Sequence, residues 1–230
     1  MKNRRLKGRV LKQRVYELLQ EKDLETALIE LRQFPARRVV NPLISFFYHG
    51  EAAIKWKAIT LMGAVTADLA QEDMEGARVV MRRLMWNLND ESGGIGWGSP
   101  EAMGEILASH EGLAKEYASI LISYAREDGN YLEHPVLQRG LVWGIGRLAQ
   151  FRPSLLKHTA PFLLPFLQSP DHVVRGTAAW TVGLLGIQEA RPALEALTGD
   201  EKELLLYLDR RLAKRRVKDL AQEALERLPL

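Results

Sequence analysis

The stretch that decides the fold lies near the C-terminal end of the chain and reads VRGTAAWTVGLLG over residues 174–186. A second short segment, ARPAL, follows at residues 190–194. Apolar and polar residues do not alternate strictly, as they would in a half-buried strand, and the spacing is helical. Many of the residues are small, which lets two helices approach closely. The stretch therefore predicts a tightly packed helix pair.

The same stretch resembles the HEAT-like repeat of the phycobilisome-lyase type, which runs V-R-x-A-A-x-x-A-L-G-x-x-G and then A-x-P-A-L. A shift of 37 residues superimposes Trp143 on Trp180 and Gly146 on Gly183, and fainter copies add Gly63 and Gly104. These four anchor glycines stand 41, 42 and 37 residues apart, enough for one helix pair per repeat. The resemblance implies an all-α fold, a right-handed α–α superhelix in the form of a HEAT-like solenoid.

The two ends of the chain differ from the repeats. We expect one domain over residues 1–230, with N-terminal capping helices at 1–40, about four HEAT-like repeats at 41–198 and a C-terminal capping helix at 199–230. Both ends read as charged amphipathic helices, and Leu204, Leu208 and Leu212 share one face at helical spacing. Terminal repeats need such polar outer faces, so the ends are interpreted as caps.

Several polar residues and prolines mark expected helix boundaries. Asn41 and Ser99 each stand before a proline, as a capping residue does before the first helical position. Asp171 indicates a further start, and Pro161 and Pro165 should break the helix that contains them.

Composition and charge exclude several classes of protein. The chain of 230 residues has no cysteine, which excludes disulfides and thiolate chemistry, and no apolar run long enough to cross a membrane. The five histidines are scattered without metal-ligand spacing. We therefore expect a cytoplasmic protein with no metal or cofactor and no membrane partner. The net charge of +3 is uneven, because residues 1–50 carry +6 and residues 51–130 carry −6.

A glycine-rich loop is the first candidate functional segment. It joins Asn89, Asp90 and Glu91 to Trp97 and has four glycines between residues 93 and 98. It lacks both the strand and spacing of a dinucleotide fingerprint and the lysine of a P-loop. Two interpretations remain open. The loop either binds a protein or a small polar ligand, or it is a tight connection in which Trp97 fills the core.

A row of residues three before each anchor glycine is the second candidate. In the repeat that this chain resembles, that position is polar and lies on the exposed side of the second helix, so the row should line the concave surface. The row and two nearby arginines are Thr60, Glu101, Trp143, Trp180, Arg139 and Arg175. Exposed tryptophans favour recognition, and the arginines could bind anions or aromatic rings. The alternative is that both tryptophans pack between repeats or under the terminal helix.

Two functions follow from these candidates. The favoured one is a non-catalytic scaffold or adaptor that binds a protein partner on its concave surface. The alternative comes from a resemblance to HEAT-like DNA glycosylases that excise alkylated bases. Those enzymes place a tryptophan, an acid four residues on, an arginine and a second tryptophan in the order of Trp97, Glu101, Arg139 and Trp180.

By that resemblance Glu101 would be the catalytic carboxylate that stabilises positive charge on the sugar. Arg139 would contact a phosphate, and the tryptophans would cradle the damaged nucleotide. The net charge of −6 over residues 51–130 disfavours DNA, whose binding depends on neutralising phosphates. Nucleic acid is therefore the second choice of partner, and the sequence indicates no oligomeric state.

Overall fold

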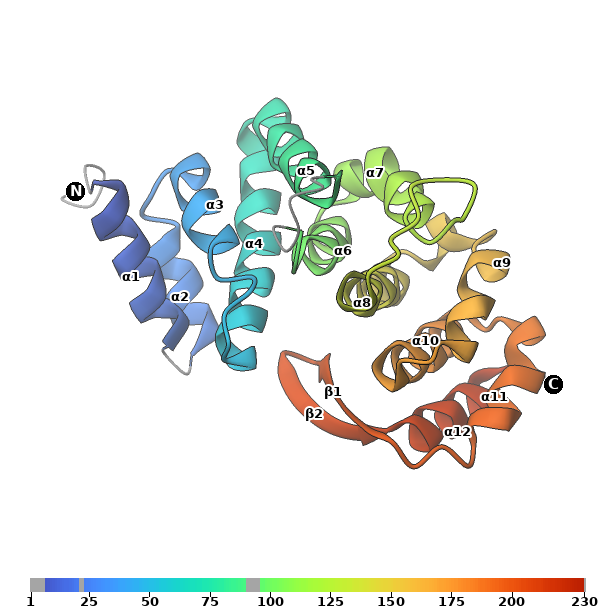
Figure 1. Cartoon of the computed structure of the whole chain (residues 1–230). Coiled ribbons are helices and arrows are strands. Elements are labelled where there is room, and N and C mark those ends of the chain that lie inside the picture. Colours follow the sequence, from blue (N-terminus) through green and yellow to red (C-terminus); the bar gives the residue numbers. More distant parts are fainter. Residues whose placement is uncertain (1–6, 21–22, 90–95, 230) are drawn as a thin grey trace. The chain divides into compact units, whose positions relative to one another are not determined.

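The chain is built mainly of helices, as the sequence predicts (Figure 1). The structure is a computed structural model that describes residues 7–20, 23–89 and 96–229. It divides into two compact units, Met1–Leu113 and Ala114–Leu230. The boundary falls inside one helix, α7 (Glu111–Ser123).

Unit 1 is a set of helices packed in sequence order. They are α1 (Gly8–Gln20), α2 (Leu24–Leu31), α3 (Ala36–Ile44), α4 (Ala52–Glu72), α5 (Met74–Asn89) and α6 (Ser99–Ser109). The long helix α4 lies at the centre, in contact with α3 on one side and with α5 and α6 on the other. In the span where N-terminal capping helices are expected, the structure has α1 and α2.

The helix expected to begin at Asn41 begins earlier. α3 starts at Ala36, directly after Pro35, and contains Pro42. A proline beyond the first turn of a helix removes one backbone hydrogen bond and disfavours continuation of the helix. Pro42 stands in the last turn of α3, which ends two residues later, so the proline marks the end of this helix rather than its start.

Unit 2 continues with helix pairs whose first members are short. Its helices are α8 (Pro135–Phe151), η2 (Pro153–Leu156), α9 (Ala160–Leu163), η3 (Leu164–Gln168), α10 (His172–Leu185), η4 (Gln188–Ala190), α11 (Arg191–Leu197) and α12 (Val217–Arg227). The break expected at Pro161 and Pro165 is confirmed, because α9 lasts one turn and continues as the 3-10 helix η3. Asp171 caps α10, as the sequence indicates, by accepting hydrogen bonds from the backbone of Val173 and Val174.

The four anchor glycines lie in α4, α6, α8 and α10, the second helix of each pair. In unit 1, α4 packs on α6, and a Cβ added to Gly63 would come within 2.6 Å of the Glu105 side chain. In unit 2, α10 packs between α8 and α12. A Cβ at Gly146 would overlap the ring of Trp180, and one at Gly183 would lie 2.8 Å from Cα of Ala224. The absence of a side chain sets these close helix approaches.

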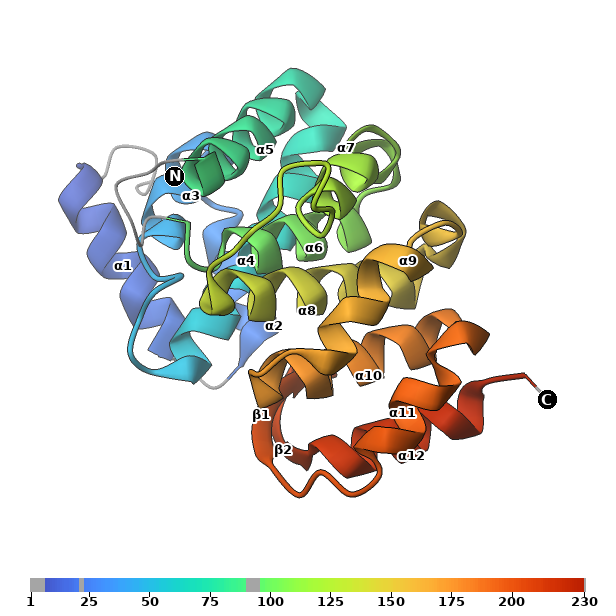
Figure 2. The same ribbon diagram turned by 45° about the vertical axis from the view of Figure 1, so that its right-hand side comes forward.

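The C-terminal segment differs from the prediction of a single capping helix. Residues 203–216 form a β-hairpin of β1 (Glu203–Leu208) and β2 (Arg211–Arg216), and only α12 after it is helical (Figures 1 and 2). The strands are antiparallel, with Glu203 opposite Arg216 and Leu208 opposite Arg211. Asp209 and Arg210 between them both have positive φ, of 47° and 64°. A two-residue hairpin turn with this backbone matches the twist of the strands.

One face of the hairpin is held on the repeats. Leu204 and Leu206 of β1 are buried, with 4% and 3% of their surface exposed, and β1 packs on α10. Gly176 of α10 makes room there, because a Cβ would lie 3.0 Å from the Leu204 side chain. In the sequence, the hairpin connects α11 to α12, the two helices of the last pair. In the structure, it covers part of α10.

Substituting Gly183 tests the close approach of α10 and α12. We expect Gly183→Ala to lower the free energy of unfolding by about 1–3 kcal/mol, because the new methyl group meets the backbone of Ala224, which cannot rotate away. The steric cost exceeds the roughly 1 kcal/mol by which alanine is more favourable than glycine in a helix interior. Urea unfolding followed by circular dichroism measures it. Gly199→Ala is the control, since nothing lies within 4 Å of its Cβ. Equal stability of the two variants would contradict the packing.

Candidate functional site

Trp143 lies under the hairpin instead of facing solvent. It is on α8 and is 3% exposed. Its indole Nε1–H donates a hydrogen bond to the backbone oxygen of Tyr207 at 2.8 Å, and the two rings lie 6.2 Å apart between centroids. A buried indole N–H needs such a partner. Trp143 thus holds β1 on α8.

Trp180 packs between two second helices. It is on α10, is 5% exposed, and its ring occupies the space that Gly146 of α8 leaves open. Thr60 and Glu101, the other members of the predicted row, are each 3% exposed. The expectation of an exposed ridge is therefore wrong, and the open alternative holds for both tryptophans. The repeat position that is usually polar here carries rings large enough to fill the space between layers.

Arg139 and Arg175 each form an ion pair with the aspartate that follows one repeat later. Arg139 contacts Asp171 with its Nε at 2.8 Å and its Nη2 at 2.7 Å. Arg175 contacts Asp200 at 3.1 Å and 2.6 Å in the same way, and also donates to the backbone oxygen of Ser169 at 2.7 Å. Both arginines are thus engaged with their own chain.

The pKa of Asp171 reflects this environment. Burial favours the neutral acid, but the hydrogen bonds from Arg139 and from the backbone N–H of Val173 outweigh burial and hold the pKa below its ordinary value of 3.8. For Asp200, burial is again outweighed, by hydrogen bonds from Arg175 and from the backbone of Lys202, and its pKa is also lowered. Both aspartates are therefore ionised at neutral pH.

Glu101 occupies an equivalent place in unit 1. Lys55 of α4 contacts its Oε1 at 2.7 Å, and only 4% of the Glu101 side chain is exposed. The Lys55 ammonium also lies 5.3 Å from the centre of the Trp56 ring. Breaking a buried pair leaves a charge without compensation, which is costly. Lys55 and Glu101 thus join α4 to α6, as Arg139 and Asp171 join successive repeats in unit 2.

Trp97 is the tryptophan of the candidate set that stays accessible, with 39% of its surface exposed. The next residue, Gly98, has a φ of 79° and is pressed against Phe47, so that any side chain there would be strained. Gly98 is also the N-cap of α6. Ser99, expected to cap the helix, is fully buried, and its Oγ has no hydrogen-bond partner among the described residues.

The structure describes only some of the remaining loop residues. Asn89 is exposed at the end of α5. Asp90, Glu91 and the first glycines of the loop lie outside the described residues. Gly96 lies against the end of α5, because a Cβ there would come within 2.9 Å of the backbone oxygen of Asn87. The two interpretations of the loop stay open.

Sequence reasoning missed the exposed face of α5. Trp86 is 74% exposed and Val79 is 53% exposed, seven residues before it on the same helix face. Between them, Arg82 pairs with Glu75 at 2.5 Å, and Arg83 donates to Asn41. A spacing of seven between two large apolar residues was the available signal. The buried face of α5 is similarly apolar, so the sequence pattern did not distinguish the exposed face from the buried one.

Two kinds of site are not found within the part of the chain that the structure describes. No cluster of three or more histidine, aspartate or glutamate side chains there could hold a metal ion. Among the described helices, none combines the length and the apolar character needed to cross a membrane.

Comparison with known proteins places the fold. A family model described as a HEAT-like repeat matches residues 135–185, the span from α8 to α10. An uncharacterized protein of Archaeoglobus fulgidus is 31% identical over 114 residues. That match covers 48% of this chain and 54% of the archaeal protein, so it spans about half of the relative's length.

The solved structures similar to this chain include designed and engineered proteins. A designed armadillo repeat protein has a TM-score of 0.52 and 18% identity, over 95% of this chain and all of the other. Another, in complex with the peptide (KR)4, has a TM-score of 0.53 and 17% identity, over 95% and 99%. An engineered protein reaches 0.54 at 16%, over 95% and 96%. The chain therefore has the fold of a mainly helical HEAT- and armadillo-type repeat solenoid with a small β-hairpin.

The residues that the glycosylase resemblance singled out have other contacts. Glu101 is buried on Lys55, Arg139 is paired with Asp171, and Trp180 fills the space over Gly146. Trp97 and Arg139 keep exposed surface, but Arg139 is engaged by Asp171. The structure thus offers no observation that favours base excision.

Replacing Asp171 by asparagine tests the ion pair without removing the helix cap. Asparagine still accepts the backbone hydrogen bonds, so the variant loses only the charge that faces Arg139. We expect a loss of about 0.5–1 kcal/mol at pH 7, because Arg139 is partly exposed and water screens the pair.

The loss should depend on pH. The carboxyl pKa is lowered in the folded state, so its contribution is present above 3.8 and disappears as the pH falls through the folded value. Urea unfolding at pH 7 and at about pH 3 should show the two proteins converging. A difference that stays constant or grows in acid would contradict this account.

Proposed function

We propose that this chain is a non-catalytic HEAT-like scaffold that binds a protein partner through the exposed tryptophans of unit 1. The exposure of Trp86 and Trp97 carries the proposal. Trp143 and Trp180 are buried and Trp56 is half-buried, so these two are the tryptophans whose rings remain in water to a large extent. Tryptophan and arginine contribute a large share of the binding energy at protein interfaces.

Both tryptophans stand on rigid supports. Trp86 projects from α5, whose opposite face is fixed in the core by Met81 and Leu84, both 0% exposed. Trp97 is followed by Gly98, whose position against Phe47 fixes the start of α6. A side chain held in this way loses little freedom when a partner binds, so more of the contact energy appears as affinity.

The charges around these rings suit a protein partner better than a nucleic acid. Residues 51–130, which contain both tryptophans, carry a net charge of −6. DNA binding depends on neutralising phosphates, and this stretch would repel them. A protein surface with an apolar pocket for each ring and acidic groups for Arg82 or Arg83 meets no such penalty.

The likeness to designed armadillo proteins supports a binding role as well. One of those proteins is in complex with a peptide. Repeat solenoids offer long surfaces that suit extended or helical segments of other proteins. Glu101, Arg139 and Arg175 pair with Lys55, Asp171 and Asp200 of the chain itself, which favours a structural role for these three residues.

Alanine substitution of the two tryptophans tests the proposal. We expect Trp86→Ala and Trp97→Ala each to weaken binding of the partner at least tenfold, because each removes a large buried ring from the interface. The partner is first captured from cell extract with the wild-type chain and identified. Its affinity for each variant is then measured by titration calorimetry.

Phe151→Ala is the matched control. Phe151 is an exposed aromatic residue of unit 2, 55% exposed, with Arg147 stacked on its ring. Its removal should leave the affinity unchanged, and circular dichroism should show the same helix content for all variants. A partner that binds the Trp86→Ala, Trp97→Ala double variant as tightly as the wild type would disprove the proposed surface.

A further inference from the structure

The outer edge of β2 is a second surface that the repeat fold does not explain. β1 contacts α10, whereas β2 lies on the other side of β1 (Figure 1). In the described residues the sheet has only these two strands, so one edge of β2 pairs with no strand. Such an edge is a ready template for an added strand.

The register identifies the backbone groups on that edge. Val217 donates a hydrogen bond to the Lys202 oxygen at 3.0 Å, and bonded pairs alternate along an antiparallel ladder. In steps of two residues back from Val217, the peptide groups of Arg215 and Ala213 also face β1. Leu212 and Lys214 therefore direct their N–H and C=O groups outward. Arg216 directs its N–H outward, whereas its C=O belongs to the N-cap of α12.

The edge of β1 is occupied in a way that supports this assignment. Tyr207 belongs to the outward-facing set of β1, and its oxygen accepts the hydrogen bond of the Trp143 indole. The chain thus covers one edge of the hairpin with a buried side chain. Within the part of the chain that the structure describes, no hydrogen bond engages the peptide groups of Leu212 and Lys214 on the other edge.

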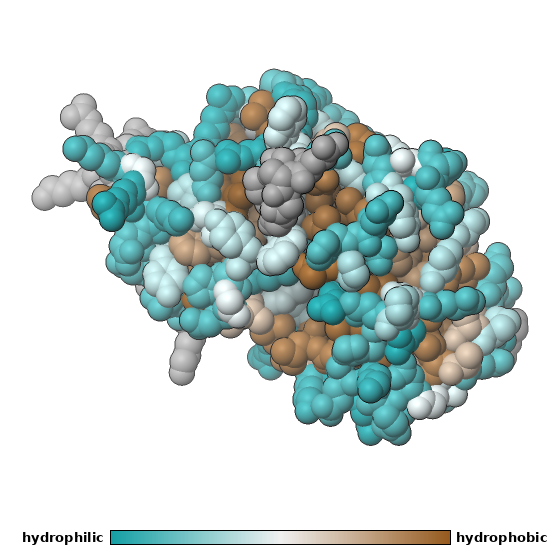
Figure 3. Space-filling model, viewed as in Figure 1, coloured by the Kyte–Doolittle hydropathy of each residue, from teal (hydrophilic) through white to brown (hydrophobic). Residues whose placement is uncertain are grey.

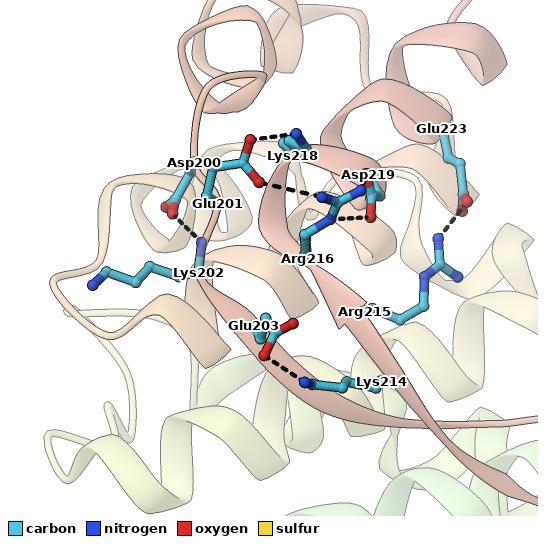
Figure 4. Close-up of polar contacts among 10 residues, drawn as sticks. All are labelled: Asp200, Glu201, Lys202, Glu203, Lys214, Arg215, Arg216, Lys218, Asp219 and Glu223. Atoms are coloured by element: carbon cyan, nitrogen blue, oxygen red, sulfur yellow. Dashed lines mark hydrogen bonds and ion pairs between the residues drawn. The ribbon is translucent and has the colours of Figure 1, made fainter.

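The charge of β2 selects the occupant. The strand reads RLAKRR, with four basic residues and no acid. Lys214 pairs with Glu203 at 2.6 Å, Arg216 with Asp219 at 3.0 Å, and Arg215 with Glu223 (Figure 4). The pairs of Lys214 and Arg216 are exposed, whereas the Arg215 side chain is 23% exposed. Exposed pairs contribute little, so an incoming carboxylate could replace the pairs of Lys214 and Arg216. The hairpin as a whole, residues 203–216, has a net charge of +3.

The same charge disfavours a second copy of the chain. Two β2 strands side by side would bring lysine and arginine side chains opposite one another, which destabilises a strand pair. An extended segment with acidic residues at alternate positions would instead place carboxylates beside Lys214 and Arg216.

We propose that the β2 edge binds an extended, acidic segment of another protein by strand addition. The segment forms backbone hydrogen bonds with Leu212, Lys214 and Arg216, and its carboxylates pair with the basic side chains. This site is separate from the tryptophan surface and does not depend on it.

The test uses a proline that removes an edge donor but no bond to β1. Lys214→Pro deletes the outward N–H of residue 214, and prolines are tolerated on strand edges where the N–H faces solvent. Lys214→Ala removes the same charge and keeps the N–H. Circular dichroism and urea unfolding confirm that both variants are folded.

The probe is a fluorescein-labelled nine-residue peptide of alternating glutamate and threonine, and a lysine–threonine peptide is its control. Fluorescence anisotropy should show the acidic peptide binding the full chain at least tenfold more tightly than the basic one. Lys214→Pro should weaken the acidic peptide at least tenfold, and Lys214→Ala by less than about threefold, because backbone bonds give most of the affinity in strand addition.

Equal affinities of Lys214→Pro and Lys214→Ala would overturn strand addition, and so would failure of the acidic peptide to bind. A wild-type dimer in sedimentation that Lys214→Pro dissolves would assign the edge to a second copy instead. Loss of binding to the partner in Trp86→Ala, with the peptide still bound, shows that the two surfaces are separate. The reverse result, a partner bound but no peptide, refutes this inference alone.

Discussion

The close approach of successive second helices at a glycine is the constraint on which the rest of the structure depends. At Gly183 the neighbouring helix comes so near that its backbone would touch a methyl group, and at Gly146 the ring of Trp180 takes the free space. Each helix pair buries its apolar face only against its neighbours, as in other repeat proteins. Each helix pair therefore needs its own close contact with the next pair.

The polar side chains follow from that arrangement. Helices that pack so closely bring the start of one beside the start of the next, which places Arg139 of α8 beside Asp171 at the start of α10. Arg175 of α10 pairs with Asp200, in the segment between α11 and β1. The same geometry sets Lys55 on Glu101 in unit 1. Residues that suggest chemistry in the sequence thus connect the layers, and the surfaces left for partners are the exposed tryptophans and the hairpin edge.

The sequence predicted the repeat architecture because its glycines carry a direct steric meaning. The anchors at Gly63, Gly146 and Gly183 mark helix contacts that the structure contains. The sequence did not decide whether Trp143 and Trp180 are exposed or buried. The position within a repeat fixes the direction of a side chain but not what covers it. Trp143 is covered by Tyr207, a residue 64 positions further on.

The hairpin escaped prediction for a related reason. Leu204, Leu208 and Leu212 are spaced as on a helix, while Leu204 and Leu206 are spaced as on a strand, so the pattern fits both structures. The turn holds Asp209 and Arg210 instead of the asparagine–glycine pair that signals a tight hairpin. Packing on α10, with room made by Gly176, decides in favour of the strands.

Hydrogen exchange at the tryptophan indoles tests most directly whether these residues are structural or exposed. In a ¹⁵N-labelled sample transferred to heavy water, the Nε1–H signal of Trp143 should persist long after that of Trp86 has vanished. Trp143 donates to Tyr207 under the hairpin, whereas Trp86 is 74% exposed. Exchange of both signals at the same fast rate would show that the hairpin does not cover α8, and would contradict the account.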